Sequence, residues 1–339
     1  MIVNFPFILE QSKSPRREMR RRNQSLVTEF ILIGFPIAQQ LQVLFFVFLL
    51  NIYLLTVTGN VIIIYIVKQC PHLHRPMYYL LINFSFMEIC YTSSTVPKMM
   101  GIFFLDNQFI SIVGCITQCY FVFVMGGMEN YLLALMAYDR YLAICHPLRY
   151  PAIMTTRLCC MLTAGCWLAT FVGSILPTIY ISRLSYCGPN EINHFFCDIS
   201  PLLEHSCTDT TFVKQYFFII IWIVIFSCAI LTLISYVSII WAIMKISSTN
   251  GRQRAFSTCT AHVTVVAIYY GTVIFVYVRP TTGDSLEVDK MVSVFYMVIT
   301  PLFNPFIYSL RNKEVKEALI KYFGNYITFT RRSSLCCGH

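Results

Sequence analysis

Seven stretches of this chain carry almost no charged residues, and each is long enough to cross a lipid bilayer as a helix. Five of them contain no Asp, Glu, Lys or Arg at all, at 30–67, 158–182, 215–244, 255–278 and 291–310. The other two, at 77–97 and 107–137, are interrupted only by Glu88 and Glu129. A helix needs roughly 20 residues to span the hydrocarbon core, whereas barrel strands alternate and are about half as long. The pattern therefore predicts an all-α membrane protein built as a seven-transmembrane helix bundle.

The composition supports the membrane class. Hydrophobic residues make up 57% of the chain and charged residues 12%, which is about half the charged fraction of a soluble protein. We expect an amino-terminal tail at 1–40, a membrane domain at 41–310 and a carboxy-terminal segment at 311–339. The expected spans lie at about 41–67, 77–100, 111–141, 158–182, 212–245, 254–278 and 288–310.

The connecting segments differ in charge, and this difference predicts the orientation. Lys and Arg gather in the linkers 68–76, 142–157 and 245–254, whereas most isolated acids lie in the opposite loops. The positive-inside rule then makes the amino terminus extracellular. A basic run at 13–22 lies about 20 residues before the first span, where the rule weakens. Asn23 begins a glycosylation sequon in this outer tail, and the net charge of +9 follows from topology rather than from nucleic-acid binding.

Four of the 15 cysteines are expected to meet on the oxidising side of the membrane. Cys115 lies at the outer end of the third span, and Cys187, Cys197 and Cys207 lie in the following outer loop. Four cysteines allow three pairings, and the residues alone do not choose among them. The alternative is a zinc site made with His194 and His205, which is less favoured because extracellular thiols oxidise.

Several motifs, in this order along the chain, resemble the olfactory receptor family of rhodopsin-like (class A) G protein-coupled receptors. They are Gly59–Asn60, PMYYLLINFSFMEIC at 76–90, MAYDRYLAICHPLRY at 136–150, CGPNEINHFFCDISPLLEHSC at 187–207, RAFSTCTAHVTVVAIYYGT at 254–272 and PLFNPFIYSLRNKEVKEAL at 301–319. The resemblance runs from about Thr28 to Leu319. Three departures are small: Glu88 where aspartate is commoner, Arg254 where lysine is commoner, and Phe303 where a smaller aliphatic residue is usual.

The resemblance implies several further features. It implies the disulfides Cys115–Cys197 and Cys187–Cys207, and a short amphipathic eighth helix after the seventh span. It also implies a multi-pass protein of the plasma membrane. The usual length of the family's outer tail leaves both Met1 and Met19 open as the translation start.

The two acids within the spans lie at similar depths. Glu129 is about three helical turns from Arg140 at the inner face, and Glu88 is as far from the inner start of its span, so both lie about 16 Å deep. Two carboxylates at one depth do not both stay charged without a cation. We expect a structural sodium ion as the only cofactor, held as in the family by Glu88, Glu129, Asn60 and Asn304. The alternative is a pair that shares a proton and hydrogen-bonds to neighbouring helices.

The triplet Asp139–Arg140–Tyr141 is the candidate activation switch, because a permanently charged guanidinium at the membrane edge needs a partner. Arg140 is expected to pair with Asp139 at rest and to approach Tyr236 and Tyr308 on activation. Pro305 lets the seventh span bend, and Tyr270 transmits ligand binding to the inner end of the sixth span. The alternative is that these tyrosines only pack. The residues expected to switch or to contact a G protein are Asp139, Arg140, Tyr141, His146, Pro147, Leu148, Tyr236, Arg254, Pro305 and Tyr308.

The ligand pocket is expected between the outer halves of spans three, five, six and seven. Helical spacing and position select the lining residues Cys119, Val122, Phe123, Gly126, Ile221, Val224, Tyr270, Val273, Ile274, Tyr277, Val294 and Met297. This lining is apolar with few polar groups, and no carboxylate is expected near Val122 to bind an amine. The sequence therefore favours a small neutral hydrophobic ligand.

These features predict an odorant receptor that activates a heterotrimeric G protein of the stimulatory, olfactory type and raises cyclic AMP. A metabolite sensor expressed outside the nose is the alternative within the same class. A transporter is less favoured, because it would show an internal repeat or a polar pathway. An enzyme is not expected, since the chain contains neither an HExxH nor a GxSxG motif.

Overall fold

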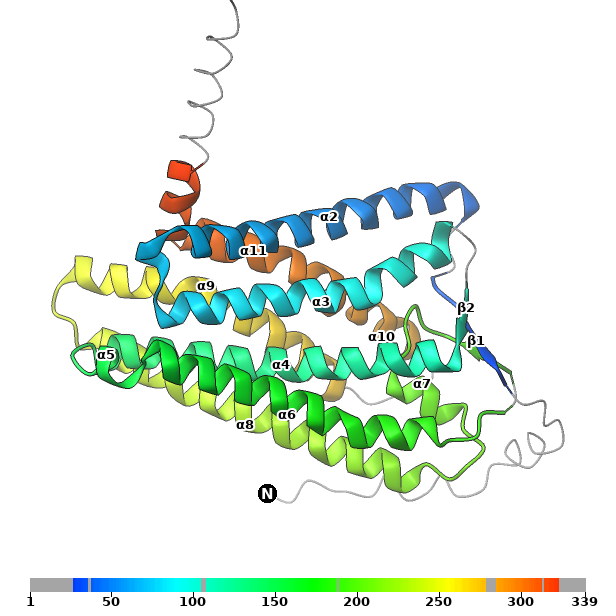
Figure 1. Cartoon of the computed structure of the whole chain (residues 1–339). Helices are drawn as coiled ribbons and strands as arrows, with labels where there is room; N and C mark the ends of the chain where they lie inside the picture. The colour runs from blue at the N-terminus through cyan, green and yellow to red at the C-terminus, as the bar shows by residue number, and fades with distance from the viewer. Residues whose placement is uncertain are drawn as a thin grey trace, which may run out of the picture.

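The long helices form one bundle, as Figure 1 shows for the computed structural model. The structure describes residues 27–35, 38–104, 108–187, 189–278, 285–312 and 314–322. Six helices are continuous: α2 (Gln39–Gln69), α3 (Pro76–Phe104), α4 (Ile112–Cys145), α6 (Thr156–Ser182), α8 (Thr211–Met244) and α9 (Thr249–Val278). The seventh span consists of α10 (Ser285–Val294), the π-helical turn η2 (Phe295–Ile299) and α11 (Thr300–Arg311). The predicted seven-helix bundle is confirmed.

Within the described residues, five of these spans are long and apolar enough to cross a membrane by length and composition alone. α3 and α9 are not among the five. α3 is less apolar because it carries Asn83, Glu88, Lys98 and several hydroxyl side chains. Many of these polar groups are buried inside the bundle, where a spanning helix tolerates them.

Local sequence signals set several helix ends. The Ser111 hydroxyl accepts a hydrogen bond from the Gly114 N–H at 3.1 Å and caps α4. The Thr155 hydroxyl caps α6 in the same way, from the Leu158 N–H at 3.2 Å. Side-chain oxygens at this position satisfy a backbone donor that has no partner in the helix. Each cap therefore fixes the residue at which its helix begins.

A small sheet closes the end of the bundle that the sequence predicts to be extracellular. Its strand order is β2-β1-β3, with β1 (Glu29–Leu32) antiparallel to β2 (Phe109–Ser111) and parallel to β3 (Glu191–Ile192). Phe30 and Leu32 of β1 are completely buried, and the Phe30 ring meets the Tyr186 ring edge-on at 5.1 Å between centroids. The amino-terminal segment is thus part of the folded outer cap, which the sequence did not predict.

The outer loop is fixed by two disulfides, Cys115–Cys197 and Cys187–Cys207, whose Cα atoms are 5.3 Å and 5.8 Å apart. These are the pairings that the resemblance implied, so the zinc alternative is wrong. The loop also contains the short helix α7 (Ile199–Glu204), which lies near the sheet at the same end of the bundle (Figure 1).

Short helices lie at the opposite end of the bundle, which the sequence predicts to be cytoplasmic. They are η1 (Pro71–Leu73), α5 (Tyr150–Ile153) and the segment 314–322, the expected eighth helix. Val315 and Ala318 are buried in this segment, whereas Lys316 and Glu317 between them are exposed. The alternation of faces makes the eighth helix amphipathic.

Candidate functional site

A cavity of about 350 Å³ lies within the bundle, mainly between α4, α6 and α8. Six of the predicted pocket residues line it, and they form an apolar wall on α4, α8 and α9. They are Val122, Phe123, Gly126, Ile221, Val224 and Val273. A helical glycine at position 126 leaves room, because a Cβ atom built there would meet nothing within 4 Å.

Four predicted pocket residues do not line the cavity: Cys119, Tyr270, Val294 and Met297. Tyr296 takes the place of Val294 and Met297 on the seventh span. The π-helical turn at Phe295–Ile299 inserts one residue and changes the face of Met297, whereas Val294 precedes the turn and was assigned to the wrong face without its influence. The side chains of Ile274 and Tyr277 lie outside the described residues.

The fourth span contributes to the cavity, which sequence reasoning missed. Its lining residues are Ala169, Thr170, Gly173, Ser174 and Pro177 of α6. Most have small side chains, and one helical turn separates the Ala–Thr pair from the Gly–Ser pair, so they leave space on one helix face. This repeat of small residues was the available signal, but its meaning depends on which helix packs opposite.

A carboxylate also lines the cavity, contrary to expectation. Asp198 follows Cys197 in the outer loop, and the Cys115–Cys197 disulfide ties that loop over the bundle. The backbone N–H of Cys197 donates a 2.9 Å hydrogen bond to Gln118 Oε1, which fixes the loop further. One Asp198 oxygen accepts the Ile199 N–H at 2.7 Å and caps α7. The sequence placed no acid here because the loop path depends on the disulfide.

The polar wall continues inward on α4 and α9. Glu129, Asn130 and Tyr269 line the cavity, and all three side chains are buried. Asn130 Nδ2 donates to the Tyr269 hydroxyl at 2.5 Å and to the Gly126 carbonyl at 2.9 Å. The first of these bonds joins α4 to α9 beside the cavity.

The four predicted sodium ligands are all buried, and the structure brings two of them into contact. Asn304 Nδ2 donates a hydrogen bond to Glu88 Oε1. Glu88 Oε2 has no hydrogen-bond partner among the described residues. Glu129 is close enough to Glu88 for their charges to interact. Asn60 instead donates to the Thr56 carbonyl of its own helix at 3.0 Å.

The predicted ion pair between Asp139 and Arg140 is not formed, which corrects the sequence-based expectation. Asp139 is buried and its Oδ1 accepts a 2.8 Å hydrogen bond from the Tyr150 hydroxyl. Burial and the neighbouring Asp139 raise the pKa of Tyr150 above its ordinary value, so this hydroxyl remains a donor. Adjacent residues on a helix point in different directions, and Asp139 and Arg140 therefore face different neighbours.

Arg140 lies near α8 and α9, and α8 carries the predicted switch residue Tyr236. Its charge acts on Tyr236 of α8 and on Cys259 and His262 of α9. The Tyr236 hydroxyl is hydrogen-bonded to His262 Nδ1, and both side chains are buried. This bond joins α8 to α9 near the predicted cytoplasmic end.

The expected G protein surface is only partly described. Tyr141 and His146 Nε2 are hydrogen-bonded at 3.1 Å, His146 and Pro147 are exposed, and Leu148 is 96% exposed. Pro305 is buried in α11. The side chains of Arg254 and Tyr308, and the whole of Asn23, lie outside the described residues.

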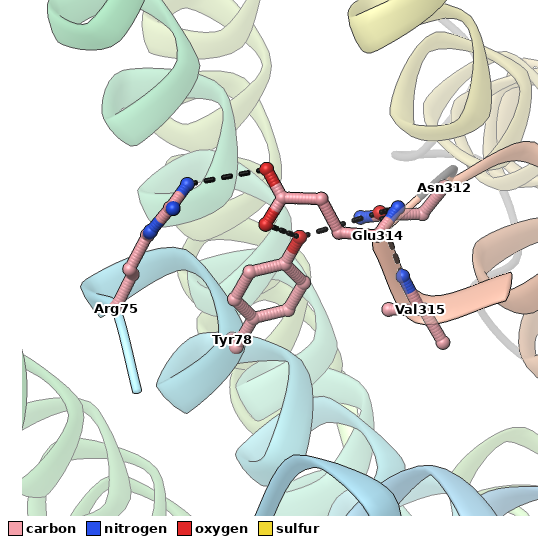
Figure 2. A network of polar contacts seen from close by, with 5 residues as sticks. All are labelled: Arg75, Tyr78, Asn312, Glu314 and Val315. Atoms are coloured by element: carbon pink, nitrogen blue, oxygen red, sulfur yellow. Dashed lines mark hydrogen bonds and ion pairs between the residues drawn. The ribbon is translucent and has the colours of Figure 1, made fainter. Parts of the chain in front are cut away.

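A polar network that the sequence did not reveal joins the eighth helix to α3 (Figure 2). Glu314 Oε1 accepts from Arg75 Nη1 at 3.2 Å, and Glu314 Oε2 accepts from the Tyr78 hydroxyl at 3.0 Å. The same hydroxyl is 3.3 Å from Asn312 Oδ1, which also accepts the N–H groups of Glu314 and Val315. Asn312 therefore caps the eighth helix while Tyr78 holds it.

The arrangement of the seven spans is that of the rhodopsin fold. The chain superposes on the crystal structure of squid rhodopsin with a TM-score of 0.57, covering 88% of this chain and 91% of that one. The two sequences are 16% identical, so this likeness shows the fold alone.

The family model described as "Olfactory receptor" matches residues 49–325, and the chain belongs to the olfactory receptor family. It is 50% identical to human Olfactory receptor 6F1 over 299 residues, which is 88% of this chain and 97% of the relative. It is 49% identical to rat Olfactory receptor 226 over 306 residues, 89% of this chain and 94% of the relative. The protein is thus a multi-pass membrane receptor of this family and not an enzyme, and the resemblance seen in its motifs is confirmed.

Proposed function

We propose that this receptor binds a small, neutral, hydrophobic volatile in the cavity between α4, α6 and α8, and activates a stimulatory, olfactory-type G protein that raises cyclic AMP. Membership of the family supports a small-molecule ligand and a G protein partner in general. The single observation that carries the ligand proposal is the cavity of about 350 Å³ with a largely apolar wall. The receptor would act in the plasma membrane with its amino terminus outside.

The size and wall of the cavity suit this ligand class. Small-molecule sites usually occupy about 300–1,000 Å³ and combine apolar walls with a few oriented polar groups. The cavity lies at the lower end of this range, so it favours a compact ligand. Phe123, Val122 and Ile221 offer dispersion contacts, whose summed energy grows with the number of touching atoms.

The proposed route from ligand to G protein runs along α9. Tyr269 and Val273 touch the cavity, and His262 lies about two turns further in on the same helix. A ligand that displaces the outer half of α9 would strain the Tyr236–His262 hydrogen bond at the inner half. Release of Tyr236 would let its hydroxyl approach Arg140 and open the cytoplasmic end to the G protein.

We also propose a sodium ion beside Glu88 as the resting-state cofactor. The donor set fits, because Glu88 Oε2 is a buried acceptor without a hydrogen-bond partner among the described residues. Asn304 is hydrogen-bonded to Glu88 and the charge of Glu88 acts on Glu129, so both are candidates for further oxygen ligands, whereas Asn60 would have to turn from the Thr56 carbonyl. A bound cation would neutralise the two buried acids. The other explanation for this pair is a shared proton.

The test is cyclic AMP accumulation in cells that display the receptor, screened against volatile odorants. Arg140→Ala should abolish the response at equal surface display. Arg149→Ala is the matched control, because Arg149 carries the same charge on the same cytoplasmic side but is exposed. A response that survives Arg140→Ala contradicts the proposed switch. Silence of the displayed wild-type receptor toward every volatile contradicts the proposed ligand class or the proposed transducer.

A further inference from the structure

We infer that the cavity selects ligands that carry a hydrogen-bond donor, and specifically a small hydrophobic alcohol whose hydroxyl binds Asn130. The inference rests on the proposed function, because it takes the cavity as the ligand site. It goes further by assigning the polar group of the ligand and the receptor atom to which that group hydrogen-bonds.

The hydrogen bonds of Asn130 fix the orientation of its amide. Its nitrogen donates to the Gly126 carbonyl at 2.9 Å and to the Tyr269 hydroxyl at 2.5 Å. A carbonyl oxygen can only accept, so the amide nitrogen and not the amide oxygen must face Gly126. Both hydrogens of the amide are then in use. The oxygen is left as the free end of the side chain.

That oxygen is a buried acceptor without a partner. Asn130 is 5% exposed, and its Oδ1 has no hydrogen-bond partner among the described residues. The side chain lines the cavity, but its oxygen is covered in this structure, so a ligand donor would reach it through a small shift of the wall beside it. A buried acceptor that stays unpaired destabilises the folded protein, and a ligand donor removes this penalty on binding.

The unpaired Asn130 oxygen can only accept hydrogen bonds, and this decides which ligands it can bind. A hydroxyl donates to Oδ1, whereas an ether, ester, ketone or aldehyde presents only an acceptor and would place two oxygens against each other. Asp198, at the outer end of the cavity, adds a second group that accepts hydrogen bonds. A hydroxyl therefore fits this position better than these acceptor groups do.

The position of Asn130 also orients the ligand. It follows Val122 by about two helical turns, or about 12 Å along α4. The hydroxyl of the bound alcohol would thus point inward to Asn130. Its hydrocarbon part would lie outward against Val122, Phe123 and Val224, where the wall is apolar.

The experiment compares isomers that differ only in this group. Purified receptor is titrated with octanol and with its isomer heptyl methyl ether, and the thermal stabilisation by each ligand is measured. The same comparison is made for hexanol, heptanol, nonanol and decanol, each against its isomeric methyl ether. Each alcohol should bind about tenfold more tightly than its isomeric ether. This comparison uses the unmodified receptor and does not depend on the folding of any variant.

Two substitutions locate the effect. Asn130→Leu keeps a side chain of similar size without the acceptor, so alcohol affinity should fall to that of the ether while ether affinity holds. Tyr269→Phe removes one partner of the amide nitrogen but keeps Oδ1, so the preference for alcohol should remain. Melting temperatures without ligand report whether each variant is folded.

The outcomes separate this inference from the proposed function. Equal affinity for the isomers in wild type overturns the inference, as does a preference for alcohol that survives Asn130→Leu. Cyclic AMP responses to ethers or aldehydes alone overturn it while leaving the odorant receptor function intact. An alcohol preference without any cyclic AMP response upholds it and contradicts the proposed coupling. Binding of no compound overturns both the inference and the proposed ligand class.

Discussion

Substitution of Tyr78 by phenylalanine should loosen the eighth helix without unfolding the receptor. The Tyr78 side chain is buried, and its hydroxyl lies 3.0 Å from Glu314 Oε2 and 3.3 Å from Asn312 Oδ1 (Figure 2). Both acceptors belong to the start of the eighth helix. Tyr78→Phe removes these bonds while keeping the ring and its packing, so the change acts on the junction alone.

The expected loss is modest and can be compared with that of the nearby ion pair. A hydrogen bond of this kind contributes about 1 kcal/mol net, because Glu314 remains partly hydrated when the donor is removed. The Arg75 and Glu314 side chains are 59% and 42% exposed. An ion pair this exposed contributes about 0.5 kcal/mol or less. Tyr78→Phe should therefore release the eighth helix more than Arg75→Ala does, even though only the second change breaks an ion pair.

The assay is amide hydrogen exchange of the segment 314–322 in purified receptor. Loss of about 1 kcal/mol from local opening speeds exchange about fivefold, and loss of about 0.5 kcal/mol speeds it about twofold. Tyr180→Phe is the control, since it makes the same chemical change on α6 away from this junction. Faster exchange in Arg75→Ala than in Tyr78→Phe would refute the reasoning, as would unchanged exchange in Tyr78→Phe.

Three other expectations follow from the structure. Gly126→Ala fills open space in the cavity and should weaken binding of bulky volatiles several-fold in thermal-shift titrations, whereas Gly127→Ala meets an α6 methyl at 3.1 Å and should lower surface display instead. Burial and the nearby Lys290 lower the pKa of His194 from 6.5 to about 3. The unfolded loop binds a proton at His194 and the folded loop does not, so the free energy of unfolding should fall below pH 6.5 by up to about 1.4 kcal/mol per pH unit. His194→Phe should make the melting temperature nearly independent of pH between pH 5 and 6.5. The Cys115–Cys197 disulfide closes a loop of sequence separation 82 and the Cys187–Cys207 disulfide one of 20, so removing the first should destabilise the protein by about 1 kcal/mol more. The comparison is of melting temperatures between the double variant Cys115→Ser, Cys197→Ser and the double variant Cys187→Ser, Cys207→Ser.

The spans and the disulfides were predictable because their signals are local or carried by specific motifs. An uncharged stretch of bilayer length becomes a helix whatever its neighbours are, since backbone groups in lipid must pair within the segment. The strand Glu29–Leu32 was not predictable in this way. After Glu29 its residues are as apolar as those of the span that follows, and its partners are about 80 and 160 positions further along the chain.

The lining of the cavity was predictable on helices such as α4, for which the side facing the rest of the bundle could be inferred. Val122, Phe123 and Gly126 follow helical spacing below Cys115, and all three line the cavity. On the seventh span Met297 was assigned the wrong face because the π-helical turn adds a residue there, and Val294, which precedes the turn, was misassigned from position alone. Asp198 was missed because its position depends on the loop path, which the disulfide sets.

The Asn130–Tyr269 and Tyr236–His262 hydrogen bonds together link the cavity to the predicted cytoplasmic end through a single helix. Both bonds have one partner on α9, and their α9 residues are about two turns, or about 10 Å, apart. A helix of this length moves as a stiff rod unless a proline or π turn interrupts it, and α9 contains no proline. A ligand hydroxyl on Asn130 Oδ1 binds the same amide that holds Tyr269. The Asn130 amide would therefore bind the ligand with its oxygen and α9 with its nitrogen, so substitutions at Asn130 should change both ligand affinity and the cyclic AMP response.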